Sequence, residues 1–559
     1  MKKILAILIL AIAVTGCSDY LDKEPLHTPD ETTFWKTEAD AEKAINSLYN
    51  YLPNARRWWT ECYSDNAIMT NAWGEGGLGE IKQGGLSATT GHIQSGYHWS
   101  PWRYDHIRQI LYYIKNVQKI EVKDQSVKDN YEGQARFILA LRYFKMTRVF
   151  GDLPLIKEEP VSIDEARELT RSSQKEVFAY IAENVNKAVD MLPDVHDKSG
   201  RITKDAALML KAEVWMWMAS LDRFHGRSVS DKSADQLFAE AATAVKSIVD
   251  KNRYVLEDDF VTLFQSVTNN TDNETILARQ YVEDEIQNMI NVLGVPGGVS
   301  LRGGGWASFS APRNLIDDYE CTDGKSIKES PLYDKANPWE NRDSRLTSWF
   351  LLPKYPVLRQ NGEYTLFESH PSYAGTDHRE ALGGEGGGGR SGYWGVKYVE
   401  MDNQIHYGHQ NFIIYRYGET LLMLAECLNE SDPTNSLIAW AMNEVRSRGG
   451  LPGVDDILGN QQAMREKILH ERRVELVNED RRYWDLLRTK TAEIFMNPEG
   501  NQLYGINKNE DDYNNAVGDW TKEKVIAEPI KFDASKGYLW PVPQDVIDKN
   551  DKITQNPGW

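Results

Sequence analysis

Long stretches of apolar residues at helical spacing, arranged in consecutive pairs, constrain the fold of this chain more than any other feature. In each stretch apolar residues recur every three or four positions, which is typical of the buried face of an amphipathic helix. The segment 205–220 is apolar on nearly every side, so we expect it to be buried on nearly every side. The sequence predicts helices at residues 37–52, 102–120, 131–150, 174–192, 203–221, 233–250, 411–429, 435–448 and 461–488.

A short turn at residues 430–433 connects the helices predicted at 411–429 and 435–448. Helix, tight turn and helix, repeated without strict sequence identity, is typical of a degenerate tetratricopeptide-like stack. The chain of 559 residues is also too long for one hydrophobic core of ordinary size, in agreement with a repeat array. The predicted fold class is therefore mainly α, with a tetratricopeptide-like helical hairpin scaffold.

Two regions lack helical periodicity. Residues 54–101 combine glycines with tryptophans, and we predict loops there. Residues 255–405 are rich in Gly, Pro, Asp, Asn and aromatic residues, and loops of this kind often carry binding side chains. We therefore predict a loop-rich, irregular ligand-binding insert at 255–405, between an N-terminal helical part at 31–254 and a C-terminal helical part at 406–559. The three parts form one unit, and we expect the apolar, proline-rich tail to pack onto it.

The N-terminus has the pattern of a lipoprotein signal. Lys2 and Lys3 precede an apolar run of eleven residues at 4–14, and Gly16 stands directly before Cys17. This order predicts a signal peptide at 1–16, an acylated Cys17 and a polar tether at 17–30, which would place the body of the protein outside the cytoplasm. An ordinary secretory signal is an alternative. An uncut membrane anchor is less favoured, because spanning a bilayer takes about 20 residues.

Charge and cysteine content exclude several classes of protein. The formal charge is −19, or −21 once the two lysines of the signal are removed, and this charge repels nucleic acid. Lipidation would leave Cys62, Cys321 and Cys427, which allow at most one disulfide, and we expect Cys427 to pack as a small apolar side chain. No cysteine and histidine spacing suits zinc, so we predict neither a metal nor a cofactor.

No catalytic motif stands out in the sequence. Nucleophile elbows, P-loops and paired metal-binding histidines are absent, and the segment from His470 to Glu475 lacks the second histidine of a zinc peptidase. The charges of this segment and the next, such as Arg472 with Glu475 and Glu479 with Arg482, predict an ion-pair lattice at a surface or interface. A pair of catalytic carboxylates for glycoside hydrolysis remains open, because their separation in space decides that mechanism.

Several short segments occur along the chain in a characteristic order. They are 17–22 (CSDYLD), 135–144 running into 150–155, 201–207, 317–319 ahead of 323–325, 342–346, 415–426, 471–476 (ERRVEL), 480–486 (DRRYWDL) and 555–558 (QNPG). Taken together, they resemble the SusD/RagB family of outer-membrane nutrient-binding lipoproteins. The resemblance extends from one end of the chain to the other.

The resemblance implies a non-enzymatic lipoprotein on the outer face of the outer membrane. Such a protein binds an oligosaccharide or polysaccharide and sits over a SusC-like TonB-dependent transporter. It has a helical tetratricopeptide-like scaffold and carries its ligand on a loop-rich insert. Some family members are implicated in peptide uptake, so a peptide-binding lipoprotein is an alternative, and a surface glycoside hydrolase is a third, less favoured one.

The shared segments are mainly scaffold, so candidate ligand residues come from sugar chemistry. A sugar ring has an apolar face for aromatic stacking and a rim of hydroxyls for polar side chains. Trp306 follows three glycines, with Arg302 nearby, and the family resemblance implies a stacking aromatic in this region. Trp73 resembles the family's other stacking position, with a loop anchor as the alternative. Tryptophans that border predicted helices are expected in the core: Trp58, Trp59, Trp99 and Trp102.

Further candidates follow the glycine run at 383–389 or lie in the first loop region. Arg390, Tyr393 and Trp394 follow the glycine run, but this segment also resembles a family strand, so we expect at least one of them to pack. Asp65 and Asn66 are candidates for hydrogen bonds to sugar hydroxyls, and a helix cap or turn is the alternative role for them. The sequence does not identify the glycan.

Overall fold

The structure is a computed structural model. It describes residues 34–69, 78–95, 97, 100–159, 162–265, 272–294, 305–306, 308–335, 337–353, 356–358, 362–367, 391–400, 407–498, 502–505 and 525–559. The predicted signal peptide, Cys17, the tether and the candidate residues Trp73, Arg302 and Arg390 lie outside these ranges.

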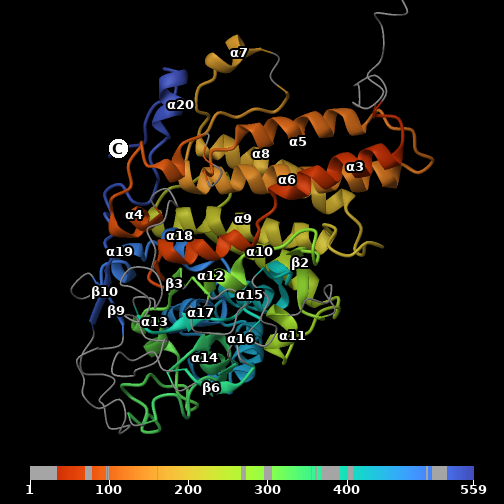
Figure 1. The fold of residues 1–559 in the computed structure, drawn as a ribbon. Helices are drawn as coiled ribbons and strands as arrows, with labels where there is room; N and C mark the ends of the chain where they lie inside the picture. The colour runs from red at the N-terminus through yellow and green to blue at the C-terminus, as the bar shows by residue number, and fades with distance from the viewer. Residues whose placement is uncertain are drawn as a thin grey trace, which may run out of the picture.

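Stacked helices form the scaffold, as predicted (Figure 1). α6 packs against α5 and α8, α8 against α9, α9 against α10, α10 against α15, and α15 against α16 and α17. This order of neighbours follows the chain, as expected for consecutive helical hairpins. The long helices are α3 (Glu38–Leu48), α5 (Tyr104–Val117), α6 (Gln125–Phe150), α8 (Gln174–Met191), α9 (Lys204–His225), α10 (Ala234–Val249), α15 (Tyr417–Ser431), α16 (Ser436–Arg448) and α17 (Gln461–Glu475).

Local sequence explains where several of these helices begin and end. Ser173 caps α8 in a capping box with Glu176, and Ser233 caps α10 in the same way. α9 ends at Gly226, whose left-handed φ of 63° favours glycine. As predicted, α9 is buried on almost all sides from residue 205 to 221.

Three predicted boundaries are wrong. The stretch 411–429 begins with strand β8 (Phe412–Arg416), which pairs with β2 (Thr275–Arg279), and becomes helical only at Tyr417. The stretch 461–488 divides into α17 and α18 (Arg482–Arg488), because Asn478 and Asp480 adopt left-handed backbone conformations. Residues 54–101, predicted as loops, contain the 3₁₀ helix η3 (Ala55–Tyr63) and the short helix α4 (Leu78–Gln83).

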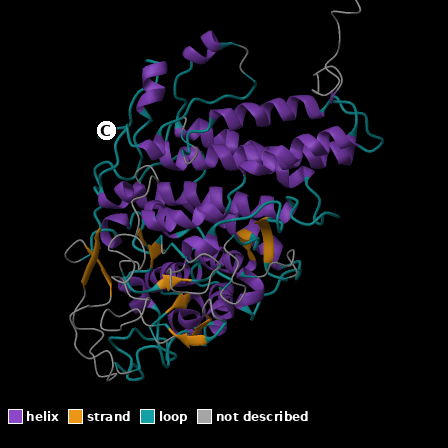
Figure 2. Ribbon diagram, viewed as in Figure 1, coloured by secondary structure: helices purple, strands orange, loops and turns teal. Residues whose placement is uncertain are grey.

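Short elements dominate the predicted insert, and Figure 2 shows the strands gathered mainly below the helical layers. The described strands form antiparallel pairs, β1–β3, β2–β8, β4–β7, β5–β6 and β9–β10. These strands are β1 (Ile68–Met69), β3 (Phe309–Ser310), β4 (Phe350–Leu351), β5 (Pro356–Leu358), β6 (Tyr364–Leu366), β7 (Trp394–Gly395), β9 (Gln502–Gly505) and β10 (Val525–Pro529). The remaining helices are η2 (Tyr49–Tyr51), η4 (Gly91–Ile93), α7 (Ile163–Arg167), α11 (Phe260–Phe264), α12 (Ile290–Gly294), α13 (Arg313–Asp318), α14 (Ser344–Trp349), η5 (Asp455–Ile457), α19 (Ala492–Phe495) and α20 (Gln544–Lys549).

The C-terminal tail packs onto the scaffold, as predicted. The amide of Trp540 donates to the carbonyl of Val149 at 2.8 Å, and its indole Nε1 donates to the hydroxyl of Tyr483 at 2.9 Å. Asn556 donates through Nδ2 to the carbonyl of Phe150. The tail therefore closes the end of α6.

The cysteines and the tryptophans that border helices lie in the core. Cys62, Cys321 and Cys427 are buried and free, so Cys62 and Cys321 are not paired, and the prediction for Cys427 is confirmed. Trp59 and Trp102 are buried, as predicted, whereas the side chains of Trp58 and Trp99 lie outside the described part of the chain. Among the described helices, none combines the length and apolar character needed to cross a membrane.

The ion-pair lattice predicted at a surface or interface lies in the interior instead. Arg345 is fully buried and pairs with Asp343, Glu471 and Glu475 at 2.7 Å each. Arg416 pairs with the backbone-distant acids Glu274, Glu475 and Glu479. The predicted i, i+3 partners are not the ones used, because Arg472 pairs with Asp485 and Arg482 pairs with Asp65. The lattice joins the insert to the C-terminal helices.

Candidate functional site

Trp306, the central predicted ligand residue, has a fixed backbone and a partly exposed ring. Its amide donates to the carbonyl of Val292 at 2.7 Å, and the amide of Ser308 donates to Leu293 at 2.9 Å. Both acceptors belong to the buried helix α12. The Trp306 side chain is nevertheless 45% exposed. A large flat ring on an ordered backbone is suited to stacking on a ligand with little loss of entropy.

The pairing of β1 with β3 brings two predicted site segments together. Met69 is opposite Phe309, and Ile68 is opposite Ser310. Because the pair is antiparallel, the chain leaves β1 and enters β3 at the same end. That end carries Trp306 just before β3. Trp73, four residues after Met69, lies outside the described residues, so its contribution stays a prediction.

A third segment joins this region through β7. The amide of Ala311, next to β3, donates to the carbonyl of Tyr393 at 2.8 Å. Tyr393 and Trp394 were candidate ligand residues, but both are buried, at 1% and 0% exposure. The Trp394 ring packs edge-on against Phe367, with ring centroids 5.2 Å apart. In this structure both side chains pack in the core and offer no face to a ligand.

Asp65 and Asn66 are also buried, and each contacts an arginine. Arg482 donates to both carboxylate oxygens of Asp65 at 2.9 Å, and Arg473 lies at 2.9 Å from the same carboxylate. Burial raises the pKa of Asp65, but Arg473 and Arg482 outweigh it, so the pKa lies below its usual value. Asn66 accepts from Nε of Arg473 at 2.9 Å. These contacts give the two residues a structural role, since they fix the start of β1 to α17 and α18.

Glu61 lies behind this strand in an apolar setting. Its Oε2 accepts from Nδ2 of Asn66 at 3.2 Å, and its Oε1 has no hydrogen-bond partner among the described residues. Burial, together with the nearby carboxylates of Asp480 and Glu479, raises the pKa of Glu61 to about 8, against the lowering effects of Asn66 and Lys397. Glu61 is therefore protonated at neutral pH.

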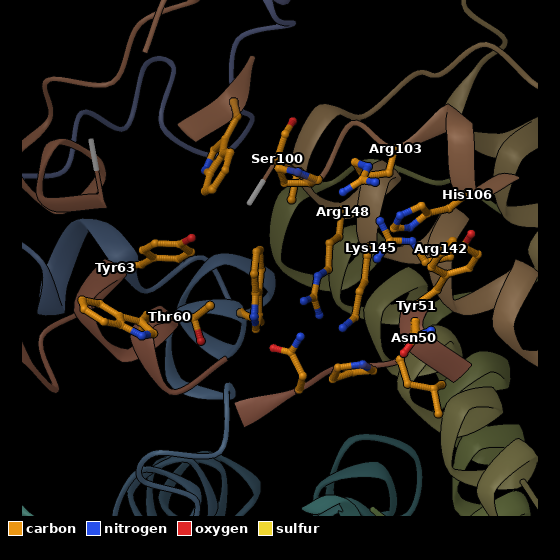
Figure 3. Close-up of a pocket in the computed structure, with 18 residues that line it drawn as sticks. Asn50, Tyr51, Thr60, Tyr63, Ser100, Arg103, His106, Arg142, Lys145 and Arg148 are labelled. Atoms are coloured by element: carbon orange, nitrogen blue, oxygen red, sulfur yellow. The ribbon is translucent and has the colours of Figure 1, made fainter. Parts of the chain in front are cut away.

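A cavity of about 350 Å³ lies between the helical layers and the tail (Figure 3). Three of its lining cations, Arg142, Lys145 and Arg148, lie on one face of α6, and Arg103 precedes α5. Sequence reasoning missed these residues, although cations at i, i+3 and i+6 in an otherwise apolar helix were a readable signal. The cavity is lined by Asn50, Tyr51, Leu52, Pro53, Asn54, Trp59, Thr60, Tyr63, Ser100, Pro101, Arg103, His106, Arg142, Lys145, Arg148, Val149, Trp484 and Trp540.

A larger hollow of about 1020 Å³ lies between α5, α7 and α20, and its walls include Trp102, Ile163 and Val546. In the described part of the chain, no group of three or more His, Cys, Asp or Glu side chains is placed to hold a metal ion.

Two family models match the chain. The model of the SusD family matches residues 273–559, and a model described as "Starch-binding associating with outer membrane" matches residues 19–216. The chain is 24% identical to SusD-like protein P2 of Formosa agariphila, over the whole of both chains. It is also 24% identical to a SusD-like protein of Bacteroides ovatus, covering 87% of this chain and 82% of that one.

Solved structures show the same fold. A SusD-like carbohydrate-binding protein from Bacteroides fragilis has a TM-score of 0.78 and 23% identity, covering 93% of this chain and all of that one. A laminarin-binding SusD-like protein has a TM-score of 0.65 and 19% identity, covering 94% of this chain and all of that one. With a family model matching its C-terminal half and relatives aligned over its full length, the chain belongs to the SusD family.

Proposed function

We propose that this protein captures an oligosaccharide at the cell surface and delivers it, without catalysis, to a SusC-like TonB-dependent transporter. Membership of the SusD family supports this proposal, as does the description of the second family model as starch-binding and outer-membrane associated. The observation that carries the site is Trp306, whose half-exposed ring stands on a fixed backbone in the loop-rich insert. Its indole would stack on the apolar face of a sugar ring.

Glycan binding and its loss in Trp306→Ala test the proposal. The purified protein should bind a subset of oligosaccharides on a glycan array, and the variant should lose at least about tenfold in affinity, as expected for a stacking hot spot. Trp440→Ala is a matched control, because Trp440 is 36% exposed but lies on the scaffold helix α16. Both variants should unfold at the wild-type temperature. Unchanged affinity of Trp306→Ala would remove the site from the proposal.

The same ligands separate the alternatives. A binding protein leaves its oligosaccharide intact, whereas release of reducing sugar by the purified protein would establish a glycoside hydrolase. Binding of peptides without binding of any glycan would establish the peptide-uptake alternative.

The proposal also places the protein on the outer face of the outer membrane, anchored through an acylated Cys17. Support comes from the order of basic, apolar and small residues before Cys17 and from the outer-membrane description of the second family model. Cys17→Ala should abolish surface attachment and leave ligand binding by the purified protein unchanged. Surface proteolysis of intact cells, with immunoblotting of the membrane fraction, measures the first effect. A tagged copy should also co-purify with the transporter from detergent extracts.

A further inference from the structure

The cavity of about 350 Å³ concentrates positive charge in an acidic protein. Arg142, Lys145 and Arg148 are each less than 10% exposed, and Arg103 adds a fourth cation at the edge. Figure 3 shows Arg148 and Lys145 extending side by side into the hollow, with Arg103 above them and Arg142 beside His106. The chain as a whole has a net charge of −19, so this site reverses the sign of the surrounding field.

The lining contains cations and no carboxylate among the residues that the structure describes there. The nearest carboxylates with printed contacts lie outside the lining: Asp105 pairs with Arg103, and Glu213 is 3.5 Å from Arg148. His106 reports the resulting potential. Burial, then Arg142 and Arg103, lowers the pKa of His106 to about 3, although Asp105 raises it.

Aromatic and hydroxyl groups form the rest of the wall. Tyr63 and Thr60 face the cations from the opposite side of the hollow (Figure 3). Trp59 and Trp540 also line it, and the rings of Tyr51 and His106 stack with centroids 3.8 Å apart. Flat apolar faces beside hydroxyl groups are suited to a sugar ring, whereas an inorganic anion alone would need only the cations.

The size and opening of the cavity limit the ligand. Its volume is at the small end of the roughly 300–1,000 Å³ range of ligand pockets, which favours a single sugar unit over a long chain. Asn50 is exposed, and the Arg103 side chain is 21% exposed, so both mark the mouth.

We propose that this cavity binds an acidic sugar, with its carboxylate or sulfate group on Arg103 and Lys145 and its ring against the aromatic wall. This inference rests on the proposed function in that the ligand is a glycan, and it adds the chemical class of one sugar unit. Charge-assisted hydrogen bonds from buried cations are about twice as strong as neutral ones, so the acidic group would dominate affinity. The site is separate from the exposed surface at Trp306.

Isothermal titration of the purified protein with four probes tests this proposal: glucuronic acid, glucose 6-sulfate, glucose and inorganic sulfate. At low ionic strength at least one acidic sugar should bind, glucose should bind at least about tenfold more weakly, and added salt should weaken binding. The acidic sugar should also bind more tightly than inorganic sulfate, because only the sugar reaches the aromatic wall.

Two substitutions locate the binding. Arg103→Gln should weaken binding of the acidic sugar about tenfold, the typical effect of losing one charge-assisted hydrogen bond. Arg108→Gln is the matched control, because Arg103 borders both hollows whereas Arg108 borders only the larger one. Lys145→Met keeps the length of a buried side chain and removes its charge, and it should have a similar effect. Thermal unfolding of each variant shows that the fold is retained.

Several results would overturn the proposal. They are no heat with either acidic sugar, equal affinity for glucose and glucuronic acid, tighter binding of inorganic sulfate than of either sugar, or unchanged affinity in both Arg103→Gln and Lys145→Met. The Trp306→Ala variant keeps the two proposals distinguishable. If neutral oligosaccharides bind at Trp306 but acidic sugars do not bind in the cavity, this inference fails while the proposed function stands.

Discussion

Replacing Glu61 by glutamine should remove a large part of the pH dependence of stability. Glu61 is 1% exposed and keeps one hydrogen bond, from Asn66. Its ordinary pKa is 4.5, and its pKa in the folded protein is about 8. Between these two values the folded protein holds one more proton than the unfolded chain, so the fold weakens as the pH rises. The stabilising contribution is complete below pH 4.5 and lost above pH 8.

The magnitude follows from the difference in pKa. A difference of 3.5 between the folded and ordinary values, at 1.36 kcal/mol for each pKa unit, corresponds to about 5 kcal/mol between pH 4.5 and pH 8. An unfolding entropy of about 2.1 cal/mol/K per residue gives about 1.2 kcal/mol/K for a chain of this length, so the midpoint should shift by about 4 °C. Glutamine has the same shape, keeps an oxygen for Asn66 and does not titrate.

Thermal unfolding of wild type and Glu61→Gln at pH 5, 7 and 9 measures this effect. The two should unfold at similar temperatures at pH 5, and the variant should be about 4 °C more stable at pH 9. Lys397, whose pKa is lowered to about 8 chiefly by burial, titrates in both proteins and does not enter the difference. Glu340→Gln, at an exposed position, serves as the control. Parallel wild-type and Glu61→Gln curves across this range would refute the reasoning.

Three further substitutions test other parts of the fold. Arg345→Met leaves the buried carboxylates of the ion-pair lattice without their central cation and should cost about 3–5 kcal/mol, measured as a lower midpoint in urea. Gly324→Ala forces a side chain into a left-handed backbone with its Cβ 2.7 Å from the ring of Pro452, so it should cost about 1–3 kcal/mol, whereas an unchanged midpoint would contradict the assigned strain. Ser173→Ala removes the cap of α8 and should cost about 1 kcal/mol, and Ser173→Thr should restore most of it.

Local sequence patterns determined the scaffold. Apolar spacing predicted every long helix, because the period of a helix is visible in consecutive residues. The boundaries failed where a longer-range contact decided the conformation: β8 forms because Phe412–Arg416 pairs with β2, more than 130 residues earlier in the chain. Segments outside the described residues leave Trp73, Arg302 and Arg390 as predictions.

The candidate site was only partly readable. Trp306 was found from its glycine-rich context, and the structure places it on the surface next to β3. Asp65 was chosen for its chemistry, but only the fold shows that Arg473 and Arg482, about 400 residues later, enclose its carboxylate. A polar side chain in a loop segment has the same sequence signal whether it binds a ligand or a distant arginine.

The sequence by itself determined the helical hairpins, the loop-rich insert, the packed tail and the family, because each depends on residues close together in the chain. Only the tertiary structure decided which charges are buried and where a cavity forms. The cationic cavity takes its walls from η2, η3, α6, α18 and the tail, which are separated by hundreds of residues. Helical periodicity fixes which face of α6 carries Arg142, Lys145 and Arg148, but packing between distant segments decides that this face lines a hollow.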